Sequence, residues 1–280
     1  MGRAGPGGAV SRLGPVARVL APAKLTLSLR VLGVRPDGFH ELDSEMVSLD
    51  LADELYIDAD GDGLEIVFDE VAGPVSDGPA NLVRRALDAV GRRAAVRLVK
   101  RIPIGGGLGG GSSDAAAVLR WAGCHDLEVA ARLGADVPFC MRGGRARVGG
   151  LGERVVPLED QPRSFVLLVP PLAVDTAAVY RSWDELPEAR QRASGEEDEN
   201  DLTAAALAVA PELARWRDRL AEMTRRSPRL AGSGATWFVE GTRAEIGLAE
   251  ARGVELDGLM GRLIPVRTVG PERSAAQKAG

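Results

Sequence analysis

Pro103-Ile104-Gly105-Gly106-Gly107-Leu108-Gly109-Gly110-Gly111-Ser112-Ser113-Asp114-Ala115-Ala116-Ala117 is the stretch of this sequence that decides the fold. Its glycines add backbone entropy that folding must remove, so they serve best where a backbone wraps closely around something. An Ala/Val/Leu run follows and predicts a helix from Ser113, whose N-terminal N–H groups favour an anion, usually a phosphate. A flexible linker is the alternative. The strand-like run 94–102 and the helix on either side favour the anion site.

Two common nucleotide-binding loops do not match this segment. A Walker A loop needs Gly-Lys-Ser/Thr, and no lysine follows the glycines. The spacing Gly105-x-Gly107-x-x-Gly110 fits the dinucleotide fingerprint, but in so glycine-rich a run that match is nearly automatic. A Rossmann unit also needs an acidic residue at the end of the next strand, and the acids in the right range, Asp126 and Glu128, fall in a helical pattern.

Composition bounds the remaining possibilities. The 280 residues are 45% hydrophobic, enough for a sizeable core in one or two domains, and the net charge of −5 argues against a nucleic-acid partner. No apolar run is long enough to cross a membrane, so we expect a cytoplasmic protein. Cys124 and Cys140 lack metal-ligand spacing, and we expect reduced core thiols. We expect residues 1–18 to be a disordered extension and residues 271–280 to be a polar tail.

Lysine is rare in this chain, which otherwise uses arginine for its positive charges. Lys278 belongs to the polar tail, and Lys100 lies in an alternating strand pattern to which we assign no role. Lys24 interrupts the apolar stretch Val19–Leu27, whose period-two alternation predicts a half-buried strand. A compact ammonium there can hold a phosphate or lower the pKa of a neighbouring group. The alternative is an ordinary strand lysine lying along apolar surface.

Two further segments carry chemically useful side chains. Arg35-Pro36-Asp37-Gly38-Phe39-His40-Glu41-Leu42 predicts a turn followed by an aromatic ring and an imidazole, which together suit a planar heterocycle. A plain hairpin with an incidental histidine is the alternative. Leu133-Gly134-Ala135-Asp136-Val137-Pro138-Phe139-Cys140 places a carboxylate among small and apolar residues, where it must be paired, neutral, functional or a cap.

A third glycine cluster, Leu230-Ala231-Gly232-Ser233-Gly234-Ala235, precedes a strand-like run over 236–240. This cluster either lies against the first glycine loop or forms an ordinary turn.

Five of these segments together resemble a known superfamily. Residues 21–25 (Ala-Pro-Ala-Lys-Leu), 103–117 and 230–235 resemble the three signature motifs of the GHMP kinases, in the same order. Within that superfamily, residues 37–42 and 133–138 are similar to the 4-diphosphocytidyl-2-C-methyl-D-erythritol kinases. The likeness spans roughly residues 19 to 270.

The resemblance implies an α+β fold of two domains, the GHMP kinase fold. Residues 19–158 would form an ATP-binding domain like domain 2 of ribosomal protein S5, and residues 159–270 a ferredoxin-like domain. The sequence agrees in outline, because Asn200-Asp201 can cap a helix from about Leu202. The apolar residues of the next helical pattern are Leu213, Trp216, Leu220 and Met223.

The resemblance also implies an activity: ATP-dependent phosphorylation of the 2-hydroxyl of 4-diphosphocytidyl-2-C-methyl-D-erythritol, in the non-mevalonate isoprenoid precursor pathway. Asp136 matches the family's base, and Lys24 the lysine that keeps this base ionised. Mg²⁺ would bridge the β- and γ-phosphates, with ligands that the sequence does not identify. The ATP-binding residues by this likeness are Pro103, Ile104, Gly105, Gly106, Gly107, Leu108, Gly109, Gly110, Gly111, Ser112 and Ser113. The substrate-binding residues are Thr26, Phe39, His40 and Thr176, with Phe39 stacking on the cytosine and His40 bonding its edge.

Three positions depart from the family pattern. Thr26 and Asp114 stand where relatives usually have asparagine, and the helical region 115–134 is shorter than usual. Two alternatives stay open: a GHMP kinase for another small alcohol, such as homoserine or a mevalonate-type substrate, and a non-catalytic nucleotide-binding relative. A cytosine platform at residues 37–42 would be useless to homoserine or mevalonate. We expect a small-molecule substrate and ATP as partners, without nucleic acid or membrane, and a monomer or weak dimer.

Overall fold

The computed structural model describes residues 16–68, 76–186, 200–248 and 251–271. Most of the expected N-terminal extension (1–15) and of the polar tail (272–280) lies outside these described residues.

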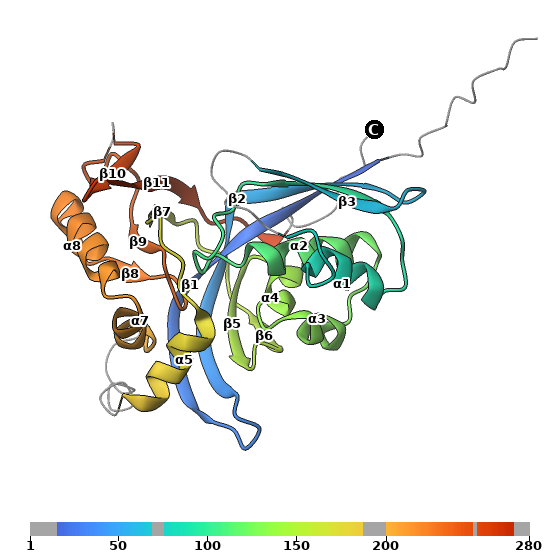
Figure 1. The fold of residues 1–280 in the computed structure, drawn as a ribbon, viewed down its shortest axis with the longest axis horizontal. Helices are drawn as coiled ribbons and strands as arrows, with labels where there is room; N and C mark the ends of the chain where they lie inside the picture. Colours follow the sequence, from blue (N-terminus) through green and yellow to red (C-terminus); the bar gives the residue numbers. More distant parts are fainter. Residues whose placement is uncertain (1–15, 69–75, 187–199, 249–250, 272–280) are drawn as a thin grey trace, which may run out of the picture.

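The first half of the chain builds a six-stranded sheet (Figure 1). β2 is its central strand: β1 pairs along one edge, while β4 and β5 pair with opposite ends of the other edge. β3 adds to β4 as the one parallel pair among the described strands, and β6 adds to β5. The strands are β1 (Ala17–Val34), β2 (His40–Asp58), β3 (Gly63–Phe68), β4 (Ala95–Lys100), β5 (Arg145–Gly150) and β6 (Arg154–Pro157).

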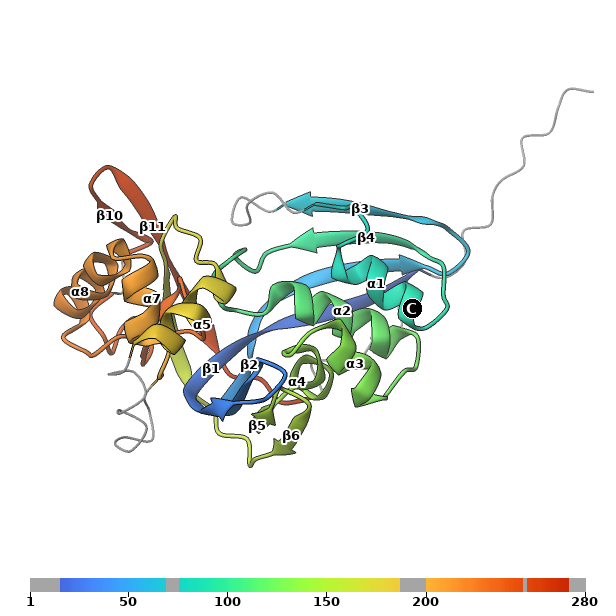
Figure 2. The ribbon, with the colours of Figure 1, turned by 60° about the horizontal axis from the view of Figure 1, so that its bottom comes forward.

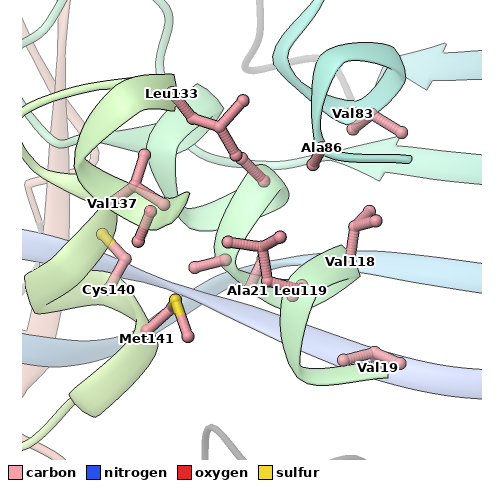
Figure 3. Packing of buried hydrophobic residues seen from close by; sticks show 14 of the residues in the cluster. Val19, Ala21, Val83, Ala86, Val118, Leu119, Leu133, Val137, Cys140 and Met141 are labelled. Atoms are coloured by element: carbon pink, nitrogen blue, oxygen red, sulfur yellow. The ribbon is translucent and has the colours of Figure 1, made fainter. Parts of the chain in front are cut away.

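Four helices cover one face of this sheet (Figure 2). They are α1 (Leu82–Ala89), α2 (Gly110–Trp121), α3 (Leu127–Leu133) and α4 (Val137–Arg142). The buried face of α2 presents mainly alanine, valine and leucine, so the helix packs closely on the sheet. Figure 3 shows the resulting core, in which Val118 and Leu119 of α2 lie among residues of β1, α1 and α4.

The second half builds a five-stranded antiparallel sheet in the order β10-β11-β7-β9-β8. Its strands are β7 (Ser164–Val169), β8 (Arg229–Leu230), β9 (Trp237–Glu240), β10 (Gly253–Leu256) and β11 (Leu259–Arg267). Its helices are α5 (Thr176–Glu185), α7 (Thr203–Val209) and α8 (Glu212–Thr224). The apolar pattern that predicted α8 buries Leu213, Trp216 and Leu220, as expected. The α+β fold class is confirmed.

β1 differs from the half-buried strand that its alternation predicted. Every residue from Ala21 to Leu27 is buried, because β1 has a covering layer on both faces. A register shift between Pro22 and Lys24 changes which side chains face which layer. Before it, Ala21 packs in the core beneath the helices, and after it Leu25 packs against the second sheet. The same shift places Lys24 and Thr26, two residues apart, on one side of the strand.

β1 also belongs to the second half of the molecule. Leu29 and Val31 are buried in the core of that half, and the carboxylate of Asp201 accepts a hydrogen bond from the Val31 N–H at 2.9 Å. The chain passes from the first sheet to the second through residues 158–163. Because one strand serves both cores, a division into separable domains at residue 158 stays a prediction. Among the described helices, none has the length and apolarity to cross a membrane.

Candidate active site

The glycine-rich loop connects β4 to α2, as the sequence predicted, but the helix begins earlier. We expected it from Ser113, whereas α2 starts at Gly110 with Gly109 as its N-cap at φ +68°. Glycine is a poor helix former, so its presence in the first turn hid the true start from pattern analysis. The glycines therefore supply both the loop and the first N–H groups of the helix, which have no partners within the helix itself.

The third glycine cluster lies against this loop, which decides between our two alternatives. The Ala235 N–H donates to the Gly105 carbonyl at 3.3 Å. Gly107 has φ +73°, and a side-chain carbon there would overlap the carbonyl oxygen of Ala231. Asn200 holds the cluster from outside, since its side-chain amide donates to the carbonyls of Leu230 and Gly232. The loop, which belongs to the first half of the molecule, is thus packed tightly against the second half.

A cavity of about 370 Å³ opens beside the loop. Its walls come from the loop itself, from the N-terminus of α1 at Asn81 and Leu82, and from Lys100 and Asp114 beneath the loop. Ile104 is 40% exposed and supplies an apolar surface at the rim. This volume lies within the range of small-molecule sites, and the unpaired N–H groups of the α2 first turn give it a preference for anions.

Lys24 and Asp136 meet next to the loop, although they come from β1 and from the N-terminus of α4. Lys24 Nζ lies 3.4 Å from Asp136 Oδ2 and 3.1 Å from Thr26 Oγ1. The Lys24 side chain is 6% exposed and that of Asp136 is 30% exposed, so the carboxylate is the one that faces solvent. Gly109 makes room for the lysine, because a side-chain carbon there would lie 2.7 Å from Lys24 Cγ. The pair is a buried cation holding an accessible carboxylate.

Thr176 reaches the same region from the second half. It opens α5, and its Oγ1 lies 2.8 Å from Ser233 Oγ in the third glycine cluster. The neighbouring Gly232 faces Lys24, since a side-chain carbon there would lie 3.4 Å from Lys24 Nζ. Lys24, Thr26, Asp136 and Thr176 are therefore brought to one place.

His40 lies at the other end of α5. The sequence did not predict the residues that contact it there. His40 Nε2 lies 2.9 Å from Asp184 Oδ1, and the imidazole centroid is 4.7 Å from that of Tyr180 and 5.5 Å from that of Trp183. Burial raises the pKa of Tyr180, and the charge of Asp136 adds to this rise. Tyr180 thus lies between His40 and the Lys24–Asp136 pair. Phe39 is 61% exposed at the tip of the β1–β2 hairpin, and its stacking role stays a prediction.

Lys100 is the residue that sequence analysis missed. It is buried beneath the loop, where Nζ donates to Asp114 Oδ2 at 2.7 Å and also to Asp53 Oδ2. The two carboxylates raise the pKa of Lys100 against the opposing effect of burial, so it stays charged. Burial raises the pKa of Asp114 to about 7, with Lys100 opposing and Asp53 reinforcing the rise. A strand pattern of period two gives no warning of such a cluster, because its two carboxylates lie on β2 and α2.

The two cysteines are free thiols, as predicted. Cys140 lies in α4, and burial together with the charge of Asp136 raises the pKa of its thiol to about 12. Cys124 is only half-buried, so the expectation of a core position holds for Cys140 alone.

The described residues build no cage for a metal ion, because no three histidine, cysteine, aspartate or glutamate side chains among them come together.

Comparison with known proteins gives one consistent result. Residues 81–144 match the GHMP kinases N-terminal domain. The chain is 39% identical over 248 residues to the 4-diphosphocytidyl-2-C-methyl-D-erythritol kinase of Ruegeria pomeroyi, covering 78% of this chain and 86% of that protein. For the Cereibacter sphaeroides (strain ATCC 17029) kinase of that name, the identity is 36% over 289 residues, with 91% and 100% covered.

Solved structures agree with the sequence matches. A crystal structure of 4-(cytidine 5'-diphospho)-2C-methyl-D-erythritol kinase superposes with a TM-score of 0.69 at 36% identity, covering 90% of this chain and 100% of the other. The homoserine kinase of Cytophaga hutchinsonii superposes with a TM-score of 0.60 over 97% of this chain and 99% of its own, at 15% identity, which shows the shared fold alone. The predicted two-domain GHMP kinase fold is confirmed.

Proposed function

The chain belongs to the 4-diphosphocytidyl-2-C-methyl-D-erythritol kinase family of GHMP kinases, and on that basis we propose how its residues perform the reaction. The enzyme transfers the γ-phosphoryl group of ATP to the 2-hydroxyl of 4-diphosphocytidyl-2-C-methyl-D-erythritol. The observation that carries the assignment of roles is the Lys24–Asp136 pair, held at 3.4 Å beside an anion-binding glycine loop.

The loop binds the triphosphate. Residues 103–111 line the cavity, and the first-turn N–H groups of α2 point their partial positive charge toward it. Ser113 supports this geometry from below, because its hydroxyl donates to the Pro22 carbonyl of β1. Phosphoryl transfer depends mainly on positioning and on neutralising charge, and a rigid loop serves both.

Asp136 is the base of the reaction. Its carboxylate is partly exposed and accepts the proton of the substrate hydroxyl as that oxygen forms its bond to the γ-phosphorus. The bond from this phosphorus to the bridging oxygen breaks at the same time, and ADP leaves. Lys24 balances the negative charge of Asp136 and orients its carboxylate, and Thr26 holds the lysine in place by accepting a hydrogen bond from Nζ. Mg²⁺ carried in with the nucleotide would add charge neutralisation.

The cytidine end of the substrate binds at the hairpin and α5. His40, fixed by Asp184, offers its remaining ring atoms to the edge of the cytosine, and Tyr180 supplies an aromatic face beside it. Phe39 is the second aromatic candidate, from the hairpin tip. Thr26 and Thr176 lie nearer the catalytic pair and so bind the methylerythritol part. Because ATP is the phosphoryl donor and the cysteines are free thiols, we place the enzyme in the cytoplasm. We propose that it acts as a monomer or weak dimer.

A substrate comparison tests this proposal. Initial rates of phosphate transfer from ATP are measured with the diphosphocytidyl substrate, with homoserine and with mevalonate at equal concentrations. We expect turnover of the first compound alone. Faster turnover of homoserine or mevalonate contradicts the substrate assignment, and ATP binding without any turnover favours a non-catalytic relative.

A further inference from the structure

The cluster of Asp53, Lys100 and Asp114 carries an excess negative charge directly beneath the phosphate loop. Two carboxylates share a single ammonium, and all three side chains are at most 4% exposed. The oxygens of Asp53 are fully used, because Oδ1 accepts from the backbone N–H groups of Arg101 and Ile102 and Oδ2 accepts from Lys100. The excess charge therefore resides on Asp114.

Asp114 has one oxygen with a partner and one without. Oδ2 accepts from Lys100 at 2.7 Å, whereas Oδ1 is buried with no hydrogen-bond partner. A buried carboxylate oxygen without a donor is costly, and protonation is the simplest remedy. Oδ1 is thus the place where a proton can be added without breaking any contact.

The cavity that receives the triphosphate has Lys100 and Asp114 in its wall. Gly110, at the start of α2, lies against the ammonium: a side-chain carbon there would be 3.1 Å from Lys100 Nζ. A polyanion bound in this cavity therefore lies close to the excess negative charge of the cluster. Like charges at short range disfavour the ionised form of a carboxyl group. Binding the triphosphate while Asp114 is ionised therefore costs free energy through charge repulsion.

The charged groups that act on Asp114 are Lys100, which opposes the rise in its pKa, and Asp53, which reinforces it. The other charged groups around α2 have partners elsewhere. Lys24 on β1 is held by Asp136, Arg85 on α1 donates to the Arg132 carbonyl, and Arg120 at the far end of α2 donates to the carbonyls of Leu20 and Cys140.

We propose that Asp114 is a positioning residue of the nucleotide site that is protonated in the ATP complex, so that ATP binding takes up one proton at Asp114 Oδ1. This inference rests on the proposed function, since it needs ATP at the loop. The protonated carboxyl presents an O–H donor beside a C=O acceptor, and the Lys100 contact is kept. ATP affinity then falls as Asp114 ionises in the free enzyme. Because burial raises the pKa of Asp114 to about 7, the Kd for ATP should rise about tenfold from about pH 6 to about pH 8.

Calorimetric titration with MgATP tests this inference on the full chain. At about pH 8, where Asp114 is mostly ionised in the free enzyme, the heat is measured in two buffers of different ionisation enthalpy, and the difference gives the number of protons exchanged. The Kd is measured across the same pH range for the wild type and for Asp114→Asn, a neutral isostere whose amide oxygen still accepts from Lys100. We expect uptake of about one proton and a tenfold change in Kd for the wild type, and neither for Asp114→Asn.

The outcomes separate this inference from the function on which it rests. ATP binding without proton uptake overturns the role of Asp114 and leaves the kinase assignment intact. If proton uptake persists in Asp114→Asn and disappears in Asp136→Asn, the proton binds at the Lys24–Asp136 pair. That result also overturns the role proposed for Asp114. Absence of ATP binding at every pH contradicts the proposed function as well. If Asp114→Asn fails to fold, the two-buffer titration of the wild type and of Asp136→Asn still decides the question.

Discussion

Lys24 Nζ and Asp136 Oδ2 lie 3.4 Å apart, with the lysine buried and the carboxylate partly exposed. This difference in exposure supports the roles that we propose, because the carboxylate is open to a substrate hydroxyl whereas the ammonium lies buried behind it. Asp136→Asn removes the base but keeps the shape. We expect kcat to fall by about 10²- to 10⁴-fold with MgATP affinity nearly unchanged. Steady-state kinetics together with a binding titration check this, and equal rates for the two proteins would refute the assignment.

The matched control is Asp126→Asn, the same chemical change at the carboxylate that caps α3. Asparagine caps helices as well as aspartate, so activity and stability should both be retained.

Gly107 is the point at which the two glycine clusters touch. Gly107→Ala places a methyl group against the Ala231 carbonyl and forces alanine into a positive φ, so unfolding should become about 1–3 kcal/mol easier and ATP binding weaker. Gly33→Ala is the control, because no atom lies within 4 Å of the added carbon. Urea denaturation of both variants tests the difference, and equal stabilities would show that the clusters do not clamp each other.

The Asp184 carboxylate fixes the imidazole of His40 at 2.9 Å. Asp184→Ala leaves this ring without its partner, so the KM for the diphosphocytidyl substrate should rise about tenfold, the cost of one good hydrogen bond, while the KM for ATP stays constant. Glu185→Ala removes the exposed neighbouring carboxylate and should change neither value. A parallel rise in both KM values in Asp184→Ala would indicate a general loss of structure instead.

Glu54 ties the N-terminal strand to the sheet and makes stability sensitive to acid. Hydrogen bonds from Arg18, and then from Arg101 and Tyr56, lower the pKa of Glu54 to about 2 despite its burial. A depressed folded-state pKa contributes stability above the ordinary value near 4.5, and that contribution is lost as the pH falls toward 2. Its ceiling is about 3 kcal/mol.

Glu54→Gln should therefore be less stable than the wild type at pH 7 and approach it below about pH 4. Urea denaturation at a series of pH values measures this. Glu65→Gln, at an exposed ion pair with Arg97, should show no such convergence. A constant gap between Glu54→Gln and the wild type at all pH values would rule out the linkage.

Local sequence patterns predicted the parts of this structure whose causes are local. The glycine run marks the loop, the helical spacing of Leu213, Trp216 and Leu220 marks α8, and the Pro-Asp-Gly turn marks the β1–β2 hairpin. The five motifs, found in the family's order, indicated the family. That resemblance predicted that Lys24 and Asp136 act at one site, although they are far apart in the sequence. Each of these signals is written within a few consecutive residues.

Other features depend on which segments meet in space, and no local pattern records this. Lys100 looked like an ordinary strand lysine because its partners Asp53 and Asp114 come from two other elements. The bulge after Pro22 broke the alternation from which we expected a half-buried strand. Tyr180 and Asp184 meet His40 only because α5 packs beside the hairpin.

The placement of Lys24 has a consequence for how this enzyme appears during synthesis. Lys24 is made before the neighbours that surround it, which are Leu108 and Gly109, then Asp136, and last Gly232. During synthesis, the Lys24 ammonium is therefore present long before the residues that pack around it, and the site can form only after most of this sequence has been made. The surroundings of Lys24 are therefore complete only once the chain has been made as far as Gly232.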